Sequence, residues 1–216
     1  MKNKSKNLGK RSSAESEQTK LQILDSALKV FSRYGYDATS LRKIADEAGT
    51  THGLIRHYFG DKMQLYKSVI DYTSEQYLAD LAPVFRAIKT NSHLDDPIAL
   101  AKQSLKLFAL GSLKRPEMAK LVLHEAIVES ERLDYLYAKV ENISRLFAGL
   151  FEALQTSGAI SEFESLKSYT HFIFFNLPIP LSLNKFSSSF IGKDITKEEE
   201  LDKYIERIAS LLFPNS

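Results

Sequence analysis

The sequence lacks the features that would place it in several common protein classes. It contains no cysteine among 216 residues, so a disulfide framework, a thiolate metal site and a thiol redox switch are all excluded. Its most apolar run, residues 172–183, includes Asn176, Pro178 and Pro180 and is shorter than the roughly 20 residues that a membrane span needs. The polar N-terminus has no apolar stretch typical of a signal peptide. We therefore expect a soluble cytoplasmic protein.

A strong overall charge is also missing. The net charge is +2, so a nucleic acid would be held by a local patch rather than by a general basic field. The hydrophobic fraction of 44% is enough for one or two globular domains. Basic residues gather before the first acidic one, in a Ser/Asn/Lys-rich stretch without apolar periodicity. We expect residues 1–16 to form a flexible basic tail; the alternative is a tail that follows the DNA backbone or minor groove.

No pattern typical of an enzyme is present. The sequence has neither an HExxH motif nor a glycine loop that would hold a phosphate. His124 and Glu125 are adjacent, so on a helix they point about 100° apart and do not form a ligand pair. Glu125 and Glu129 would share a helix face, where paired carboxylates are usually solvated. We expect no enzymatic activity, no cofactor and no metal site.

Residues 41–62 indicate two short helices joined by a tight turn. Leu41, Ile44, Ala45 and Ala48 follow the i, i+3, i+4, i+7 spacing of one apolar helix face. Gly49 stands where this helix must end, because glycine adopts the left-handed conformation at low cost. The predicted caps are Thr39 or Ser40 for the first helix and Thr50 or Thr51 for the second.

The second helix, expected over residues 51–58, contributes little to a core. Ile55 is its main apolar anchor and Phe59 closes it, which leaves the other side chains facing outward: His52, Gly53, Arg56 and His57. A helix-turn-helix needs this asymmetry, because its second helix presents N-terminal residues to base edges in the major groove. The alternative is an ordinary helical hairpin.

Helices are also expected on both sides of this pair. Downstream, Asp61 with Gln64 three residues later caps a long helix. Upstream, a helix that ends at Gly35 carries an apolar face to cover the other two: Leu21, Leu24, Ala27, Leu28 and Phe31.

In this order and spacing, residues 23–65 resemble the TetR family of bacterial transcriptional regulators in one run without gaps. The residues that carry the resemblance are Ala27, Phe31, Gly35, Thr39, Ile44, Ala45, Ala48, Gly49, Gly53, Ile55, Tyr58, Phe59, Lys62 and Leu65. The resemblance implies an all-α protein with an N-terminal three-helix DNA-binding domain, residues 17–77, and a larger C-terminal domain, residues 78–216, for dimerisation and ligand binding.

The resemblance also implies a DNA contact surface. Arg42 would reach the phosphate backbone or a guanine edge, and Arg56 would contact phosphate and could also reach a base. Over the bases it places Thr51, His52, Gly53 and Leu54, and along the phosphates His57, Tyr58 and Lys62. Three positions depart from the family pattern, Thr50, Leu54 and Arg56, so the operator sequence cannot be transferred by analogy.

Past residue 75 the pattern is helical. Pro97 and Pro116 are expected to start helices that run to about residues 113 and 130. Ser161 and Glu164 predict a capping box for a helix that ends near Leu177. Thr196 and Glu199 cap a final helix with one apolar face: Leu201, Tyr204, Ile205, Ile208 and Leu212.

The region between these helices contains a regular heptad pattern that predicts one long helix ending at Gly158. The heptad residues are Leu133, Leu136, Val140, Ile143, Phe147, Leu150 and Leu154. They could form the core of one chain or pack against a second copy, and the resemblance favours a homodimer. The residues expected at that interface are Leu136, Val140, Ile143, Phe147, Leu150, Leu154 and Phe172.

An effector pocket is expected in the C-terminal domain, since family members commonly bind a small molecule there and thereby shift the spacing of the DNA-reading domains. The candidate lining residues are Phe85, Phe108, Met118, His124, Phe147, Phe151, His171, Phe175 and Asn176; each could instead be a plain core residue. The aromatic side chains favour an apolar or aromatic effector.

Together these patterns predict a dimeric, sequence-specific DNA-binding regulator, most simply a repressor that its ligand releases from a pseudo-palindromic operator. Two alternatives remain open. The chain could be a ligand-binding or protein-interaction module with a degenerate DNA-binding head, or it could act as an activator.

Overall fold

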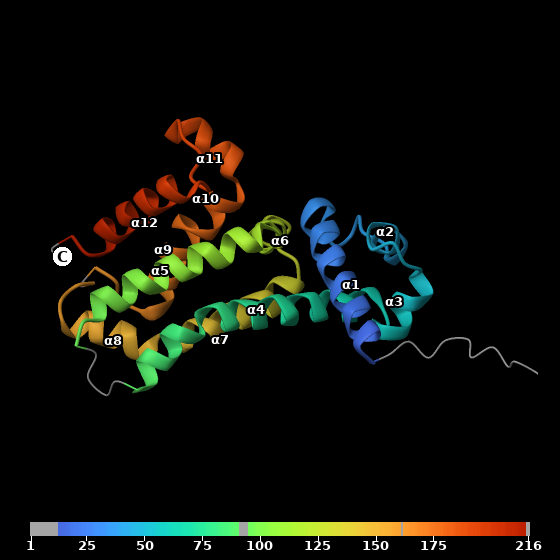
Figure 1. Ribbon diagram of the computed structural model, residues 1–216, viewed down its shortest axis with the longest axis horizontal. Coiled ribbons are helices and arrows are strands. Elements are labelled where there is room, and N and C mark those ends of the chain that lie inside the picture. The colour runs from blue at the N-terminus through green and yellow to red at the C-terminus, as the bar shows by residue number, and fades with distance from the viewer. Residues whose placement is uncertain (1–12, 91–94, 161, 215–216) are drawn as a thin grey trace, which may run out of the picture. The chain divides into compact units, whose positions relative to one another are not determined.

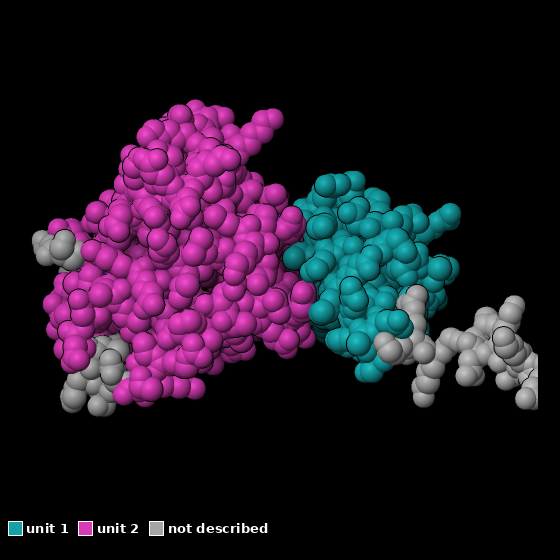
Figure 2. Space-filling model, in the orientation of Figure 1, with its two compact units in different colours: residues 1–69 teal, residues 70–216 magenta. Residues whose placement is uncertain are grey.

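The computed structural model describes residues 13–90, 95–160 and 162–214. Every regular element in these ranges is a helix, as the sequence predicts (Figure 1). The chain divides into two compact units, of which unit 1 ends at Val69 and unit 2 begins at Ile70 (Figure 2). We expected the boundary after residue 77. It lies earlier, and on the unit 2 side of it Asp71 accepts a hydrogen bond from Tyr135 at 2.7 Å and pairs with Lys139 at 2.6 Å.

Unit 1 contains α1 (Ser13–Tyr34), α2 (Leu41–Glu47), α3 (His52–Phe59) and the start of α4 (Lys62–Thr90). Residues 1–12 of the expected tail lie outside the described residues, whereas residues 13–16 form the first turn of α1. One cluster of buried side chains holds the four helices together: Ile23, Ala27, Phe31, Ile44, Ala45, Ile55, Leu65, Tyr66 and Val69. The rings of Phe31 and Tyr66 meet edge to face, with centroids 5.3 Å apart.

Unit 2 contains the rest of α4 and the helices α5 (Pro97–Lys114), α6 (Pro116–Ile127), α7 (Arg132–Arg145), α8 (Ala148–Thr156), α9 (Leu166–Asn176), α10 (Pro178–Ser182), α11 (Asn184–Ile191) and α12 (Glu198–Leu212). Helix α5 is central, because α6, α8, α10 and α12 all contact it. The predicted apolar face of α12 is confirmed: Leu201, Ile205, Ile208 and Leu212 are buried and Tyr204 is half-buried. The predicted cap is wrong, because Lys197 holds the cap position without a side-chain hydrogen bond and the Thr196 hydroxyl donates to Asp194. Figure 1 shows α12 beside α5.

Two prolines start helices where the sequence predicts them. Pro97 is the first residue of α5, and the side chain of Asp96 accepts the Ala99 N–H at 2.8 Å. Pro116 is the first residue of α6, which ends at Ile127 rather than near residue 130. In the last turn of α5, Gly111 is buried, and a Cβ there would lie 3.3 Å from Asp80 Oδ2 of α4. This glycine therefore lets the two helices pack closely.

The heptad residues do not form the single helix that we predicted. Helix α7 ends at Arg145 and α8 begins at Ala148. At the break, the N–H groups of Leu146 and Phe147 donate to the carbonyls three residues earlier, Ile143 and Ser144, which tightens the chain and ends the α-helix. The 3-4 spacing of apolar residues continues across this break, so the sequence pattern does not reveal it.

Two other expectations need correction. The helix predicted from Ser161 begins instead at Leu166, because Ser165 and Ser168 form the capping box; Ser161 lies outside the described residues. Glu125 is not solvated as expected. It is fully buried, and Arg132 contacts it at 3.1 Å while the Ser130 hydroxyl donates to it. This ion pair joins α6 to α7.

Among the described residues, none of the helices is both long enough and apolar enough to cross a membrane.

Candidate functional site

Helices α2 and α3 form the two-helix motif that the sequence predicts. The Ser40 hydroxyl accepts the Lys43 N–H at the start of α2, and the Thr51 hydroxyl accepts the Leu54 N–H at the start of α3, both at 3.2 Å. Gly49, with φ of 60°, makes the left-handed turn between them. The two helices are therefore held at a fixed turn by local hydrogen bonds.

Helix α3 is attached through one side and exposed on the other. Only Ile55 is buried, while His52, Gly53, Arg56 and His57 are exposed and Leu54 is half-buried. Among the residues that the structure describes, none requires a glycine at position 53, because an added Cβ would meet only the Thr51 hydroxyl, at 4.0 Å. Glycine weakens a helix, and the open space at this exposed position would let another molecule approach the backbone closely.

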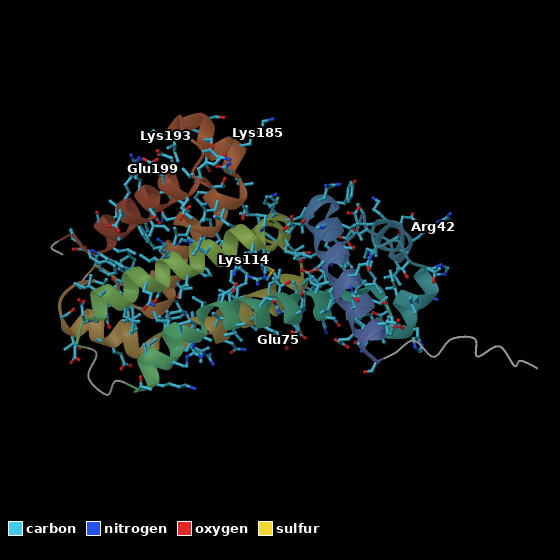
Figure 3. The ribbon with its side chains drawn as sticks, viewed as in Figure 1. Arg42, Glu75, Lys114, Lys185, Lys193 and Glu199 are labelled. Atoms are coloured by element: carbon cyan, nitrogen blue, oxygen red, sulfur yellow. The ribbon has the colours of Figure 1, made fainter. Side chains whose placement is uncertain are left out.

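Two arginines of the motif are free to bind a partner. Arg42 on α2 and Arg56 on α3 are exposed, and in the described part of the chain neither makes an ion pair or a side-chain hydrogen bond. Figure 3 shows Arg42 directed away from the helices of unit 1. A guanidinium in this state offers a planar set of N–H donors that matches a phosphate or the N7 and O6 atoms of guanine.

Two of the expected phosphate-contacting residues are engaged within unit 1. The Lys62 ammonium donates to the carbonyls of Tyr36 at 3.0 Å and Thr39 at 2.9 Å, and lies 4.1 Å from the Tyr36 ring centroid. The Lys62 ammonium is therefore already bound within unit 1, and its expected contact with a phosphate stays a prediction. Tyr58 is half-buried, and its hydroxyl lies 3.1 Å from that of Ser16, which joins α3 to α1.

Unit 2 contains an apolar cavity of about 120 Å³, here called the inner cavity. Buried or half-buried side chains from α4 to α10 line it, and none of them is charged. Its polar groups are hydroxyls of Ser74, Tyr77, Ser104, Ser144, Tyr169 and Thr170. Burial raises the pKa of both tyrosines, so they stay protonated. This inner cavity holds more than a single water, and its walls suit an uncharged, largely apolar body.

A second cavity, the vestibule, lies between α6, α7 and α9. It shares five lining residues with the inner cavity: Val122, Val140, Ser144, Thr170 and Phe174. Unlike the inner cavity, it has exposed residues at its rim, including Tyr137, Lys167, His171 and Phe175. The vestibule therefore adjoins the inner cavity through these shared walls, and its rim residues are exposed to solvent.

The predicted pocket residues fall into three groups. Phe108, Met118 and Phe147 line the inner cavity, and His171 and Phe175 line the vestibule. Phe85, His124, Phe151 and Asn176 line neither of these two cavities. Phe85 packs edge to face on Phe147, Phe151 packs on Tyr169, and the Asn176 amide donates to the Phe172 carbonyl. His124 leaves its buried Nδ1 without a hydrogen-bond partner among the described residues.

The sequence does not identify most of the residues that line the inner cavity. Tyr77, Val122, Tyr169 and Phe174 belong to ordinary amphipathic helices, and their spacing does not distinguish a cavity wall from a filled core. The heptad pattern was the available signal, because Val140, Ile143, Phe147 and Leu150 all line the cavity.

The residues that we predicted at a dimer interface face the interior of this chain. Leu136, Leu150 and Leu154 are at most 3% exposed. Val140, Ile143 and Phe147 line the inner cavity, and Phe172 packs against Phe163 with ring centroids 5.5 Å apart. Their apolar surface is used within unit 2, so we withdraw the heptad residues and Phe172 as an interface.

Comparison with known proteins identifies unit 1. Residues 23–69 match the sequence pattern of the bacterial regulatory proteins of the tetR family. The transcriptional regulator RutR of Escherichia coli K12 is 31% identical over 149 residues, which are 67% of this chain and 66% of RutR. The chain belongs to the TetR family. It spans between 51% and 66% of the length of the first curated relatives that it matches.

Solved structures of transcriptional regulators extend the likeness to both units. HlyIIR, a hemolysin II transcriptional regulator, is 26% identical with a TM-score of 0.63, over 92% of this chain and 98% of that one. FadR from Bacillus subtilis, solved in complex with stearoyl-CoA, shares the fold with a TM-score of 0.64 at 17% identity, over 91% of this chain and 98% of that one.

Proposed function

We propose that this protein is a transcriptional regulator that binds a pseudo-palindromic operator as a homodimer and is released from it by an apolar effector bound in unit 2. The observation that carries the proposal is the state of α3. It is capped, anchored through Ile55 and otherwise exposed, with Arg56 unpaired and Gly53 not required by the fold. A helix of this kind is suited to the major groove, where Arg reads guanine and small residues allow close approach.

A homodimer is part of the proposal, because two copies of α3 about one helical turn apart, roughly 34 Å, would read the two half-sites. With the heptad residues buried, the surface must lie elsewhere. Helix α11 leaves Phe186 66% exposed and Phe190 79% exposed, with ring centroids 5.0 Å apart. Exposed aromatic pairs of this kind mark interaction surfaces, and we propose that α11 contributes to the dimer contact.

The oligomeric state is measured by light scattering coupled to size exclusion. We expect a dimer for the native chain and a shift toward monomer for the double change Phe186→Ser and Phe190→Ser. The matched control is Ile127→Ser, which removes a side chain that is 80% exposed from α6. If all three proteins have the same mass, α11 is not the dimer contact.

DNA recognition is tested first by fluorescence anisotropy, with DNA from upstream of the protein's own coding region and a scrambled duplex, at several salt concentrations. We expect specific binding to exceed the scrambled control by at least about a thousandfold. Equal, weak binding to both duplexes that disappears with salt would contradict a sequence-reading function for that DNA. A wider search with randomised duplexes then decides whether any sequence is preferred; no preference would mean that the DNA-binding head is degenerate.

One curated relative, KstR2 of Rhodococcus jostii, is a transcriptional repressor that is 29% identical to this chain over 135 residues, and this supports a proposal on the direction of regulation. We propose repression relieved by ligand. A reporter under the recovered operator should be silent with the native chain and active after deletion of its gene. Loss of expression on deletion would show an activator instead.

A further inference from the structure

The effector site has two chemically different ends. The inner cavity has no charged lining residue, whereas Glu141, Lys167 and His171 line the vestibule. Val122, Val140, Ser144, Thr170 and Phe174 belong to both, so the two spaces lie against the same walls. An apolar chain would fit the inner cavity, and a polar group would be left at the solvent side between α7 and α9.

The charges at the vestibule favour one sign for that polar group. Lys167 Nζ and Arg145 Nη2 both contact Glu141 Oε1, each at 3.2 Å. Two cations thus share one carboxylate, and the three side chains together carry a net charge of +1; Arg145 lies beside the vestibule rather than in its lining. Lys167 is exposed and its ammonium lies 5.8 Å from the Tyr137 ring, so it can reach a second anion without leaving the rim. His171 adds a further hydrogen-bonding group on the same side of α9.

We propose that the effector is a single-chain amphipathic anion whose apolar chain occupies the inner cavity and whose anionic head group binds Lys167 at the vestibule. This inference rests on the proposed function, because it assigns the ligand of the same site. A free carboxylate and a thioester whose carrier bears phosphates share this chemistry, and the experiment below separates them.

The probes are decanoate, decanoyl-CoA and the neutral 1-decanol, titrated calorimetrically into the full chain at pH 8. Lys167→Gln should weaken decanoate or decanoyl-CoA binding by about fivefold, the size expected for one exposed charge pair, and leave 1-decanol unchanged. The probe that shows the loss identifies the source of the anion. Lys106→Gln is the control, since Lys106 is also an exposed lysine in an ion pair, with Asp202 at 2.9 Å, and lines neither of the two cavities.

A second variant gives a change of opposite sign. Glu141→Gln removes the carboxylate that competes for Lys167, so anion binding should become tighter, again by about fivefold, with 1-decanol unaffected. Partial unfolding cannot produce this result.

A third variant tests the inner cavity. Ser104→Leu should weaken the binding of charged and neutral probes alike, because its larger side chain fills the space for the apolar chain.

Several results would overturn the inference. The first is that Lys167→Gln weakens the binding of charged and neutral probes equally, or that Glu141→Gln leaves the affinity for the anionic probes unchanged. The others are that Ser104→Leu binds the probes as tightly as the native chain does, or that the native chain binds none of them. Anisotropy of the ligand-free protein on its operator is recorded in parallel. Specific DNA binding without probe binding would reject this effector and retain the regulator, whereas loss of specific DNA binding would reject the proposed function itself.

Discussion

The Lys62 ammonium lies 2.9 Å from the Thr39 carbonyl oxygen, at the junction between the turn before α2 and the first residue of α4. It also binds the Tyr36 carbonyl, so a single charge satisfies two backbone acceptors of one loop. The family resemblance counted Lys62 among the phosphate contacts. Its two hydrogen bonds instead attach the loop before α2 to the first residue of α4.

Lys62→Met is therefore expected to destabilise the protein rather than to change its DNA contacts directly. Hydrogen bonds to charged groups contribute about 1.5–3 kcal/mol, and the half-buried carbonyls would lose their partner. Urea unfolding measures the loss. Lys29→Met, an exposed change on α1, is the control and should be neutral. A reduced salt slope of DNA binding with unchanged unfolding would return Lys62 to the phosphate-contacting group.

The position of Lys62 shows which features can be predicted from the sequence and which cannot. Caps, turn glycines and apolar periodicity are local, so Ser40, Gly49 and Thr51 behave as predicted. Where a long flexible side chain points depends on neighbours distant in sequence, as Tyr36 is from Lys62. The predicted dimer interface of the heptad residues was wrong for the same reason. Their spacing indicates that one helix face is apolar, but the surrounding helices determine whether a cavity, a core or a second chain covers that face.

Gly53→Ala should change stability and DNA binding in opposite directions. The site has open space for a Cβ and an ordinary helical conformation, so alanine should stabilise α3 by about 0.5 kcal/mol. A methyl group between α3 and a duplex should cost about 1–3 kcal/mol in operator affinity. Thermal unfolding and anisotropy report the two effects separately.

Gly149→Ala on α8 is the matched control, since its Cβ would meet Ile88 at an ordinary 3.6 Å. It should stabilise to a similar extent and leave operator binding unchanged. If Gly53→Ala also leaves operator binding unchanged, the N-terminal end of α3 does not closely approach DNA.

Arg56→Ala tests whether the free guanidinium reads a base. If it does, binding to the operator should weaken by about 1–3 kcal/mol while binding to scrambled DNA changes much less. Equal weakening on both duplexes, with the salt slope reduced by about one unit, would make Arg56 a phosphate contact. Arg86→Ala, an exposed arginine on the unit 2 part of α4, should alter neither.

Asp80 on α4 forms ion pairs with two basic residues near the wall of the inner cavity. Its carboxylate pairs with Arg115 at 2.6 Å and Lys114 at 2.8 Å, and Arg115 lies 5.4 Å from the ring of Tyr77, which lines the inner cavity. Burial alone would raise the pKa of Asp80, but hydrogen bonds from Lys114 and Arg115 outweigh it and hold the pKa below its usual value. The folded state therefore binds a proton on Asp80 less readily than the unfolded chain does.

A lowered pKa in the folded state means that Asp80 contributes stability above the unfolded value of about 3.9 and loses it as the pH falls through the lower folded value. Asp80→Asn should cost about 1–3 kcal/mol at pH 7, between the values for exposed and buried pairs. The difference in unfolding free energy between native and variant chains should stay constant from pH 8 to about pH 5 and shrink below about pH 4. Because only this difference is compared, acid effects at other carboxylates largely cancel.

The control is Asp202→Asn, which breaks the exposed pair with Lys106 and should lower the free energy of unfolding by less than about 1 kcal/mol. A difference for Asp80→Asn that remains undiminished well below pH 4 would show that the variant loses packing rather than charge pairing.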